Sequence, residues 1–113
     1  MSLTTARIGS ILIVSPEGQI NSANAAAIEA ELISLVDGRQ RQVVLDMSRL
    51  NYISSAGLRV VLGLAKRLKQ QEGALVLCDM SPHVREVFDV SGFLAILTVT
   101  DTREQAVARL AAD

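Results

Sequence analysis

The chain has little of what metal sites, disulfides and single-stranded nucleic-acid binding require. Its 113 residues include one cysteine, one histidine and no tryptophan, and aromatic residues make up only 3%. One cysteine cannot form an internal disulfide, and one thiol with one imidazole falls short of a closed zinc site. So few aromatic side chains provide no platform on which bases could stack. We therefore expect no metal, no cofactor and no nucleic-acid partner.

Charge of one sign and long apolar runs are also missing. Eleven basic and twelve acidic residues leave a formal net charge of −1, so no basic patch for nucleic acid or an anionic membrane is expected. The longest apolar runs, such as Ala74 to Cys78, are far below the ~20 residues that span a bilayer. No charged region precedes an apolar one at the start, so we expect no signal peptide. These observations predict a cytoplasmic protein without membrane insertion, and the lack of an exposed apolar stripe predicts a monomer.

The apolar residues that are present suffice for one core. Hydrophobic residues make up 50% of the chain and charged residues 20%, which is typical of a globular domain. No linker and no repeat divides the sequence, so residues 1–113 are predicted to form a single domain. Cys78 lies in an apolar run without activating neighbours, and we interpret it as a small buried side chain.

The order of the expected elements predicts an α/β fold. Residues 3–8 and 10–15 are expected to form strands around a turn at Gly9 and Ser10, with Pro16 to Gly18 breaking the second strand before 19–21 resume it. The later elements are a helix capped by Asn21 or Ser22 and ended by Asp37 and Gly38, a strand at 43–47, a helix from Ser54 and Ser55 to Gly73, the strand containing Cys78, a helix from Ser81 and Pro82 to Ser91, a strand at 96–99 and a helix with a capping box at Thr102.

This order, β-β-α-β-α-β-α-β-α, predicts a mixed sheet. Val43 to Met47 is rich in β-branched residues and is typical of a strand buried on both faces, so we expect it to be central. An initial hairpin followed by strand and helix alternation indicates one sheet with a parallel part, packed helices and right-handed crossovers.

Enzyme motifs are not found. The seven glycines are scattered, so no phosphate-binding glycine loop is formed. A serine hydrolase would have Gly-x-Ser-x-Gly, whereas the segment from Asn51 to Gly57 lacks the first glycine and His83 is the single candidate base. No close carboxylate pair stands where a general acid and base would work together. A small hydrolase with Ser55 as nucleophile is kept as an alternative, to be tested with a fluorophosphonate probe.

Two hydroxyls stand at the junction between a buried strand and a helix. Ser54 and Ser55 are followed by the small residues Ala56 and Gly57. One serine suffices to cap the helix, which leaves the second within reach of a partner's active site. A phosphate placed there would accept bonds from first-turn N–H groups, and it would add a charge of about −1.5 to −2.

The same segment resembles the signature of the STAS domain family, in particular the small bacterial anti-sigma factor antagonists. The family pattern is approximately Val-Val-Leu-Asp-Leu-Ser, then Tyr-Ile-Asp-Ser-Ser-Gly-Leu. The chain has Val43-Val44-Leu45-Asp46-Met47-Ser48, then Tyr52-Ile53-Ser54-Ser55-Ala56-Gly57-Leu58. An earlier family motif, Gly-x-Leu-Asp, resembles Gly18 to Asn21. The expected element order also agrees with the family over nearly the whole chain.

The resemblance implies a partner-switching regulator that is not itself an enzyme. In the family, the serine after the motif's Asp is phosphorylated by a partner that is both serine kinase and anti-sigma factor. By position this serine is Ser55, with Ser54 as the second choice. The unphosphorylated antagonist sequesters the partner, phosphorylation releases it, and a serine phosphatase resets the switch. The residues expected to contact the partner are Gly18, Asn21, Ser54, Ala56, Gly57 and Arg59.

The chain departs from the family pattern at three positions. Ser54 and Asn21 each stand where the family has Asp, and Ala56 stands where it has Ser or Thr. The expected contact surface is therefore less acidic than that of the family.

Arg59 lies four residues after Ser55, on the same face of the expected helix. We expect it to pair with a phosphate on Ser55 or to contact an acidic partner surface, and a solvated charge is the alternative. Asp46 is interpreted as a structural acceptor near the serines.

Two other functions stay open within this resemblance. One is an accessory subunit of a lipid-transport ABC system, in which a lone STAS-like domain binds the ATPase. The other is a switch with the same mechanism that controls secretion or biofilm formation rather than a sigma factor.

Overall fold

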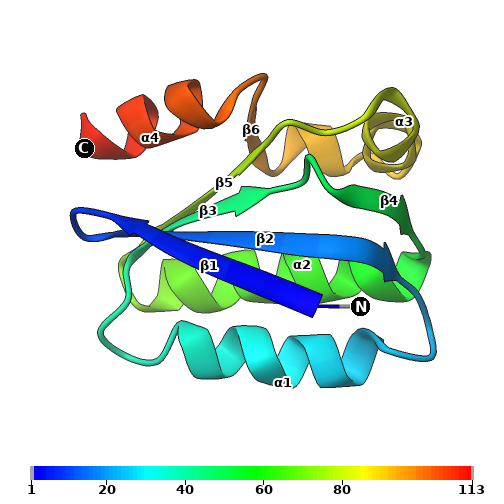
Figure 1. Ribbon diagram of the computed structural model, residues 1–113, viewed down its shortest axis with the longest axis horizontal. Coiled ribbons are helices and arrows are strands. Elements are labelled where there is room, and N and C mark those ends of the chain that lie inside the picture. Colours follow the sequence, from blue (N-terminus) through cyan, green and yellow to red (C-terminus); the bar gives the residue numbers. More distant parts are fainter. Residues whose placement is uncertain (1, 113) are drawn as a thin grey trace.

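Six strands form one sheet and four α-helices pack around it in the computed structural model, which describes residues 2–112 (Figure 1). The elements in chain order are β1 (Ser2–Ile8), β2 (Ile11–Ile20), α1 (Ala25–Leu35), β3 (Gln42–Asp46), β4 (Leu50–Ile53), α2 (Ser55–Gln70), β5 (Ala74–Cys78), α3 (Pro82–Val90), the short 3-10 helix η1 (Phe93–Ala95), β6 (Thr98–Thr100) and α4 (Arg103–Ala111). None of the helices in this range is long and apolar enough to cross a membrane.

The sheet has the strand order β1-β2-β3-β5-β6, which confirms the central place predicted for Val43 to Met47. β1 is antiparallel to β2, and the pairs from β2 to β6 are parallel, so the sheet is mixed. β4 continues beyond the end of β3 along the same neighbour, because β2 pairs with β3 up to Val14 and with β4 from Gly18 onward.

The predicted break at Pro16 to Gly18 is wrong, because β2 runs without interruption from Ile11 to Ile20. Pro16 has no N–H to donate, but it lies in the interval where β2 pairs with neither β3 nor β4. The pairing of β2 with β4 is irregular at its start, because the register shifts between Gly18 and Gln19. β2 therefore pairs with three other strands, β1, β3 and β4.

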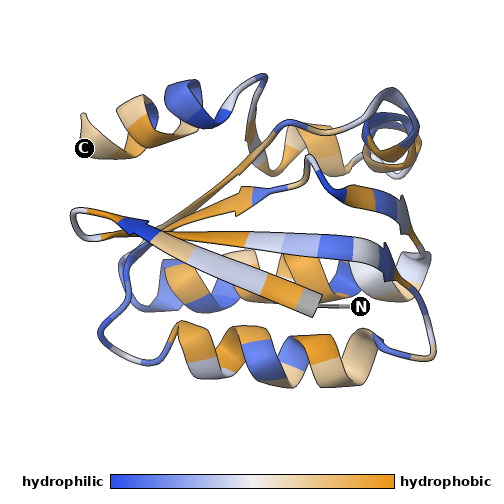
Figure 2. Cartoon of the chain, viewed as in Figure 1, coloured by the Kyte–Doolittle hydropathy of each residue, from blue (hydrophilic) through white to orange (hydrophobic). Residues whose placement is uncertain are grey.

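The helices cover both faces of the sheet. α1 and α2 lie together on one face, α4 lies on the other, and α3 packs against β4 (Figure 1). Leu12 and Leu45 point into the larger core, between the sheet and helices α1 and α2. Ile13 and Val44 point into the smaller core, between the sheet and α4. This alternation follows from the two-residue period of a strand, and Figure 2 shows the resulting apolar colour along β5 and the middle of β3.

Two of the predicted helix starts are confirmed. The Ser81 side chain accepts a bond from Val84 N–H at the start of α3, and Thr102 forms the predicted capping box with Gln105. The prediction that Asn21 or Ser22 caps the first helix is wrong.

The first helix begins at Ala25, with Asn24 in the cap position. Asn21 instead shapes the preceding turn, because its side-chain oxygen accepts bonds from the N–H groups of Ala23 and Asn24.

Two strands differ from the prediction. Residues 50–53 were not predicted as a strand, because their pattern is buried at both ends and exposed between. The last strand lies at Thr98–Thr100 rather than at 96–99, because the chain forms the 3-10 helix Phe93–Ala95 immediately before it.

Candidate functional site

The two serines lie where β4 ends and α2 begins. Ile53 pairs with Ile20 at the last position of β4, and the Ser54 N–H donates to the Ile20 carbonyl oxygen at 2.9 Å. The end of β2 and the first turn of α2 are thereby joined directly. The structure thus brings the Gly18 to Asn21 segment beside the Ser54 and Ser55 segment, although more than thirty residues separate them in the sequence.

Ser54 is the residue that caps α2. Its backbone is extended, with φ −91° and ψ 174°, and its hydroxyl oxygen accepts the Gly57 N–H at 3.2 Å. Its carbonyl oxygen accepts the Leu58 N–H at 2.9 Å. The side chain is half-buried, so its oxygen is both engaged and partly covered.

Ser55 is the first residue of α2, and its side chain is exposed. Its hydroxyl takes part in no hydrogen bond with residues 2–112. The first turn of α2 contains no acidic residue, so the partial positive charge of the helix end is not neutralised from within the helix. Ser54 and Ser55 therefore differ in the way that the sequence predicts: one serine caps the helix and the other is accessible.

Gly57 allows the first turn of α2 to lie close to the sheet. A Cβ atom at this position would be 2.6 Å from Ile53 Cγ1 and 2.9 Å from Ile20 Cγ2, which are closer than ordinary contacts. Gly57 is buried and Ala56 is half-buried, so Gly57 supports the surface that carries Ser55 and does not itself face outward.

Gly18 and Asn21 shape the neighbouring loop. Gly18 has φ +93°, a backbone conformation that favours glycine, and its N–H donates to the Arg49 carbonyl oxygen at 3.0 Å. Asn21 is half-buried and holds the turn before α1. Arg59 is exposed on α2, one turn after Ser55. The predicted partner-contact residues therefore gather at one end of the sheet, where Gly18 and Asn21 determine the backbone shape.

A family model described as STAS domain matches residues 2–106. This chain belongs to the STAS domain family. A Bordetella bronchiseptica protein, provisionally named anti-sigma factor antagonist BtrV, is 57% identical over 108 residues, which cover 96% of this chain and 93% of that protein. An anti-sigma F factor antagonist of Paenibacillus polymyxa is 29% identical over 101 residues, covering 88% and 86%.

A solved structure supports the fold of this STAS domain. The anti-sigma factor antagonist SpoIIAA in its unphosphorylated form aligns with a TM-score of 0.82 at 22% identity, covering 99% of this chain and 98% of that one. The initial hairpin and the following alternation of strands and helices agree with this neighbour, which confirms the predicted fold class.

Asp46 of this STAS domain is fixed from two sides. Its Oδ1 accepts the Ser48 N–H at 2.9 Å, and its Oδ2 accepts Arg103 Nε at 3.0 Å and Nη2 at 2.8 Å. Burial by itself would raise the pKa of Asp46, but the bonds from Ser48 and Arg103 outweigh it and hold that pKa below its ordinary value. Asp46 is thus a structural acceptor, as predicted, but its donors are Ser48 and, at the start of α4, Arg103, and neither was predicted.

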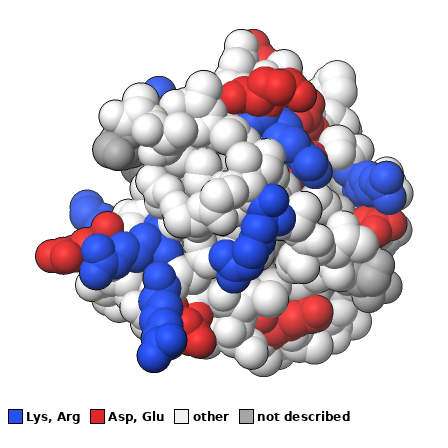
Figure 3. All heavy atoms as spheres, turned by 60° about the vertical axis from the view of Figure 1, so that its left-hand side comes forward, with Lys and Arg blue, Asp and Glu red and all other residues white. Residues whose placement is uncertain are grey.

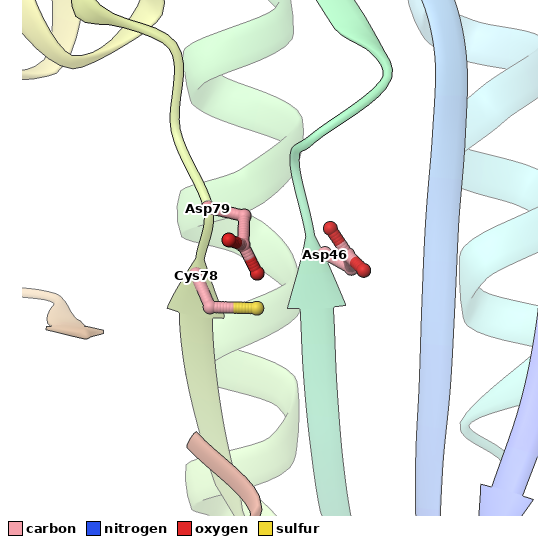
Figure 4. Close-up of side chains that lie close together, drawn as sticks. All are labelled: Asp46, Cys78 and Asp79. Atoms are coloured by element: carbon pink, nitrogen blue, oxygen red, sulfur yellow. The ribbon is translucent and has the colours of Figure 1, made fainter. Parts of the chain in front are cut away.

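Asp46 also belongs to a cluster with Cys78 and Asp79 at the ends of β3 and β5, and Figure 4 shows the Cys78 thiol directed from β5 toward β3. One ligand atom from each lies within 4.8 Å of the others. Burial, followed by the nearby charges of Asp46 and Asp79, raises the pKa of Cys78 to about 12. A protonated thiol and a carboxylate already bound to Arg103 are poor metal ligands, so we assign no metal to this cluster.

One pair of residues near the serines was missed by sequence reasoning. Tyr52, on β4, is 42% exposed and stacks on His83 of α3, with ring centroids 6.5 Å apart and planes at 23°. In the sequence, His83 was considered as a catalytic base and as a metal ligand, but not as a stacking partner. The signal in the sequence was an aromatic residue three positions before the exposed serine, and its stacking partner depends on how α3 packs on β4.

Proposed function

We propose that this STAS domain is an anti-sigma factor antagonist that switches partners through phosphorylation of Ser55. The observation that carries the proposal is the division between the two serines: Ser54 is engaged as the cap of α2, and Ser55 is exposed beside it. The names of the relatives at 57% and 29% identity support the class of function.

In the unphosphorylated state, the end of the sheet that carries Ser55 binds a serine kinase that is also an anti-sigma factor. The kinase transfers the γ-phosphoryl group of ATP to the Ser55 oxygen. The new oxygen–phosphorus bond forms as the bond to ADP breaks, and the hydroxyl proton passes to a base of the kinase. A serine phosphatase reverses the modification by hydrolysis. Catalytic groups are supplied by the partners, and this chain supplies the hydroxyl.

The position of Ser55 explains how a phosphate can release the partner without unfolding the domain. It adds a charge of about −1.5 to −2 at the positive end of a helix of sixteen residues. The first-turn N–H groups and the dipole favour that charge in the free domain. In the complex the same charge would be buried against the partner, which costs affinity unless a cation pairs with it.

Phosphorylation of the variants tests the choice of serine. With the cognate kinase and ATP, we expect the wild type and Ser54→Ala to gain one phosphate by mass spectrometry and Ser55→Ala to gain none. Ser54→Ala should also lower the free energy of unfolding by about 1 kcal/mol, because the cap bond to Gly57 is lost. A phosphopeptide that carries the group on Ser54 would contradict the proposal.

Binding by calorimetry tests the release step. Ser55→Asp should weaken binding to the kinase by about tenfold or more, since an unpaired charge is buried in the interface. Ser34→Asp is the matched control, because it places the same charge on an exposed position of α1 and should leave the affinity unchanged. Equal affinities of Ser55→Asp and the wild type would contradict a charge-driven release.

A further inference from the structure

A hollow of ≈ 810 Å³ lies at the end of the sheet opposite to Ser55. β3 begins at this hollow with Gln42 and runs away from it to Asp46, and α2 leads from Ser55 back toward the hollow. The sixteen residues of α2 span about 24 Å. The hollow is lined by Arg7, Ser10, Leu35, Asp37, Arg39, Gln40, Arg41, Gln42, Glu72, Gly73 and Ala74.

Three arginines from two separate segments meet at this hollow. Arg7 comes from β1, and Arg39 and Arg41 come from the segment between α1 and β3. Within residues 2–112, the two ion pairs involve Arg49 and Arg103. None of the three arginines at the hollow therefore has a carboxylate oxygen within 4.0 Å in this part of the chain. Figure 3 shows this end of the molecule, with basic side chains spread across it between uncharged and acidic ones.

A buried glutamine holds one of the arginines in place. Gln40 is 7% exposed, and its Oε1 accepts Arg7 Nη1 at 2.9 Å. Its Nε2 donates to the carbonyl oxygens of Ser10 at 3.0 Å and Gln42 at 2.8 Å. The Arg7 guanidinium is thereby positioned before any ligand arrives, which lowers the conformational entropy that binding would cost.

The wall beside Arg39 and Arg41 is fixed as well. Gln71 Nε2 lies 3.1 to 3.3 Å from the carbonyl oxygens of Val36, Asp37 and Gln40, which ties the end of α2 to the segment that carries both arginines. Ala74 N–H donates to the Arg41 carbonyl oxygen at 2.7 Å, and a Cβ atom on Gly73 would collide with that oxygen.

We propose that this hollow binds an acidic peptide segment of a protein partner, whose carboxylates pair with Arg7, Arg39 and Arg41. A guanidinium fork fits a carboxylate in two parallel hydrogen bonds. Asp37 and Glu72 also line the hollow, so its formal charge is only +1. Because Arg7 and the pair Arg39 and Arg41 come from separate segments, carboxylates spaced along a peptide can pair with them one at a time. The inference does not rest on the switch at Ser55.

Titration of the ¹⁵N-labelled chain followed by NMR tests the proposal. The probe is a blocked hexapeptide of alternating glutamate and glycine, and the comparison ligands are its lysine analogue and inorganic pyrophosphate. We expect the glutamate peptide to shift the amide signals of residues 7–10, 37–42 and 72–74 in a saturable way. The lysine peptide should shift none of them, and pyrophosphate should bind more weakly than the glutamate peptide.

The double variant Arg39→Gln/Arg41→Gln should weaken binding of the glutamate peptide by about tenfold or more, because two charge-assisted contacts are lost. Arg85→Gln/Arg109→Gln is the matched control, since both arginines are exposed and neither lines the hollow. Ser55→Asp should bind the peptide as the wild type does, which separates this site from the switch. No shift at millimolar peptide, unchanged binding by the Arg39→Gln/Arg41→Gln variant, or tighter binding of pyrophosphate would each overturn the proposal.

Discussion

At the scale of single residues, Gly57 and Gly63 share one helix but have opposite surroundings. A Cβ atom on Gly57 would overlap Ile53 and Ile20, whereas a Cβ atom on Gly63 would have one neighbour, Glu29 Oε2 at 3.8 Å. The first glycine is required by packing, and the second occupies an exposed helix position where glycine costs backbone entropy. The same substitution is therefore expected to have opposite effects at these two sites.

Urea denaturation followed by circular dichroism measures this contrast. Gly57→Ala should lower the free energy of unfolding by about 1–3 kcal/mol, because α2 must move away from the sheet. Gly63→Ala should raise it by up to about 1 kcal/mol, since alanine is the better helix former. A Gly57→Ala variant as stable as the wild type would show that α2 can shift freely, and the rigid support inferred for Ser55 would be lost.

Asp46 gives the domain a sensitivity to acid. Its pKa is lowered in the folded chain, so the folded state binds its proton less readily than the unfolded state does. The resulting stability is complete above the ordinary carboxyl pKa of about 4 and is lost as the pH falls through the lowered value. Asp46→Asn should therefore reduce the slope of unfolding free energy against pH below about pH 5, as measured by denaturation at each pH.

Arg103 is the other half of this pair. Arg103→Ala should lower the free energy of unfolding at pH 7 by about 1–3 kcal/mol, because the carboxylate of Asp46 stays buried without two of its donors. Arg109→Ala is the matched control, since Arg109 is exposed on the same helix and should change stability by less than about 0.5 kcal/mol. Equal losses for both variants would contradict the role given to the ion pair.

At the scale of elements, the helices could be predicted because their signals are local. Ser81 with Pro82 and Thr102 with Gln105 satisfy the first-turn N–H groups within four residues, so the sequence itself contains the cap. β4 could not be predicted, because a four-residue strand buried at its ends matches neither alternation nor an apolar run. It forms because β2 extends past β3 and provides backbone partners.

In the candidate site, too, the local features could be predicted from the sequence and the long-range contacts could not. The paired serines could be located from sequence, because a hydroxyl residue at a helix start is a local pattern. The ion pair between Asp46 and Arg103 could not, since 57 residues separate them and only the packing of α4 on the sheet brings them together. Prediction failed where the contact depends on tertiary structure, as it also did for the stack of Tyr52 on His83.

At the scale of the whole molecule, Cys78 reports on the attachment of α4. It is completely buried in the smaller core with Ala106 and Leu110 of α4. Burial raises its pKa to about 12, so the thiolate is scarce at neutral pH as well as covered. Modification of this thiol therefore requires α4 to separate from the sheet or the whole domain to unfold.

Labelling with a disulfide reagent at pH 7.5 tests this. The native chain should react far more slowly than the chain in urea, and Arg103→Ala should accelerate native labelling by about tenfold, because the bond between the start of α4 and Asp46 is lost. Arg109→Ala should react at the wild-type rate. Rapid labelling of the native wild type would mean that the smaller core is not closed.

The length of β2 imposes a constraint on insertions and deletions. This strand pairs with β1 along one edge and with β3 and then β4 along the other. One residue added or removed within β2 would shift its pairing with β1 and with β3 or β4, and would reverse the faces of the side chains beyond the change. The turn at Gly9 and Ser10 lies between β1 and β2 and is not subject to this constraint on length. Divergence in length among descendants of this chain is therefore expected to collect in its turns, while β2 keeps its length from the hairpin to Ile20, whose carbonyl oxygen accepts the Ser54 N–H.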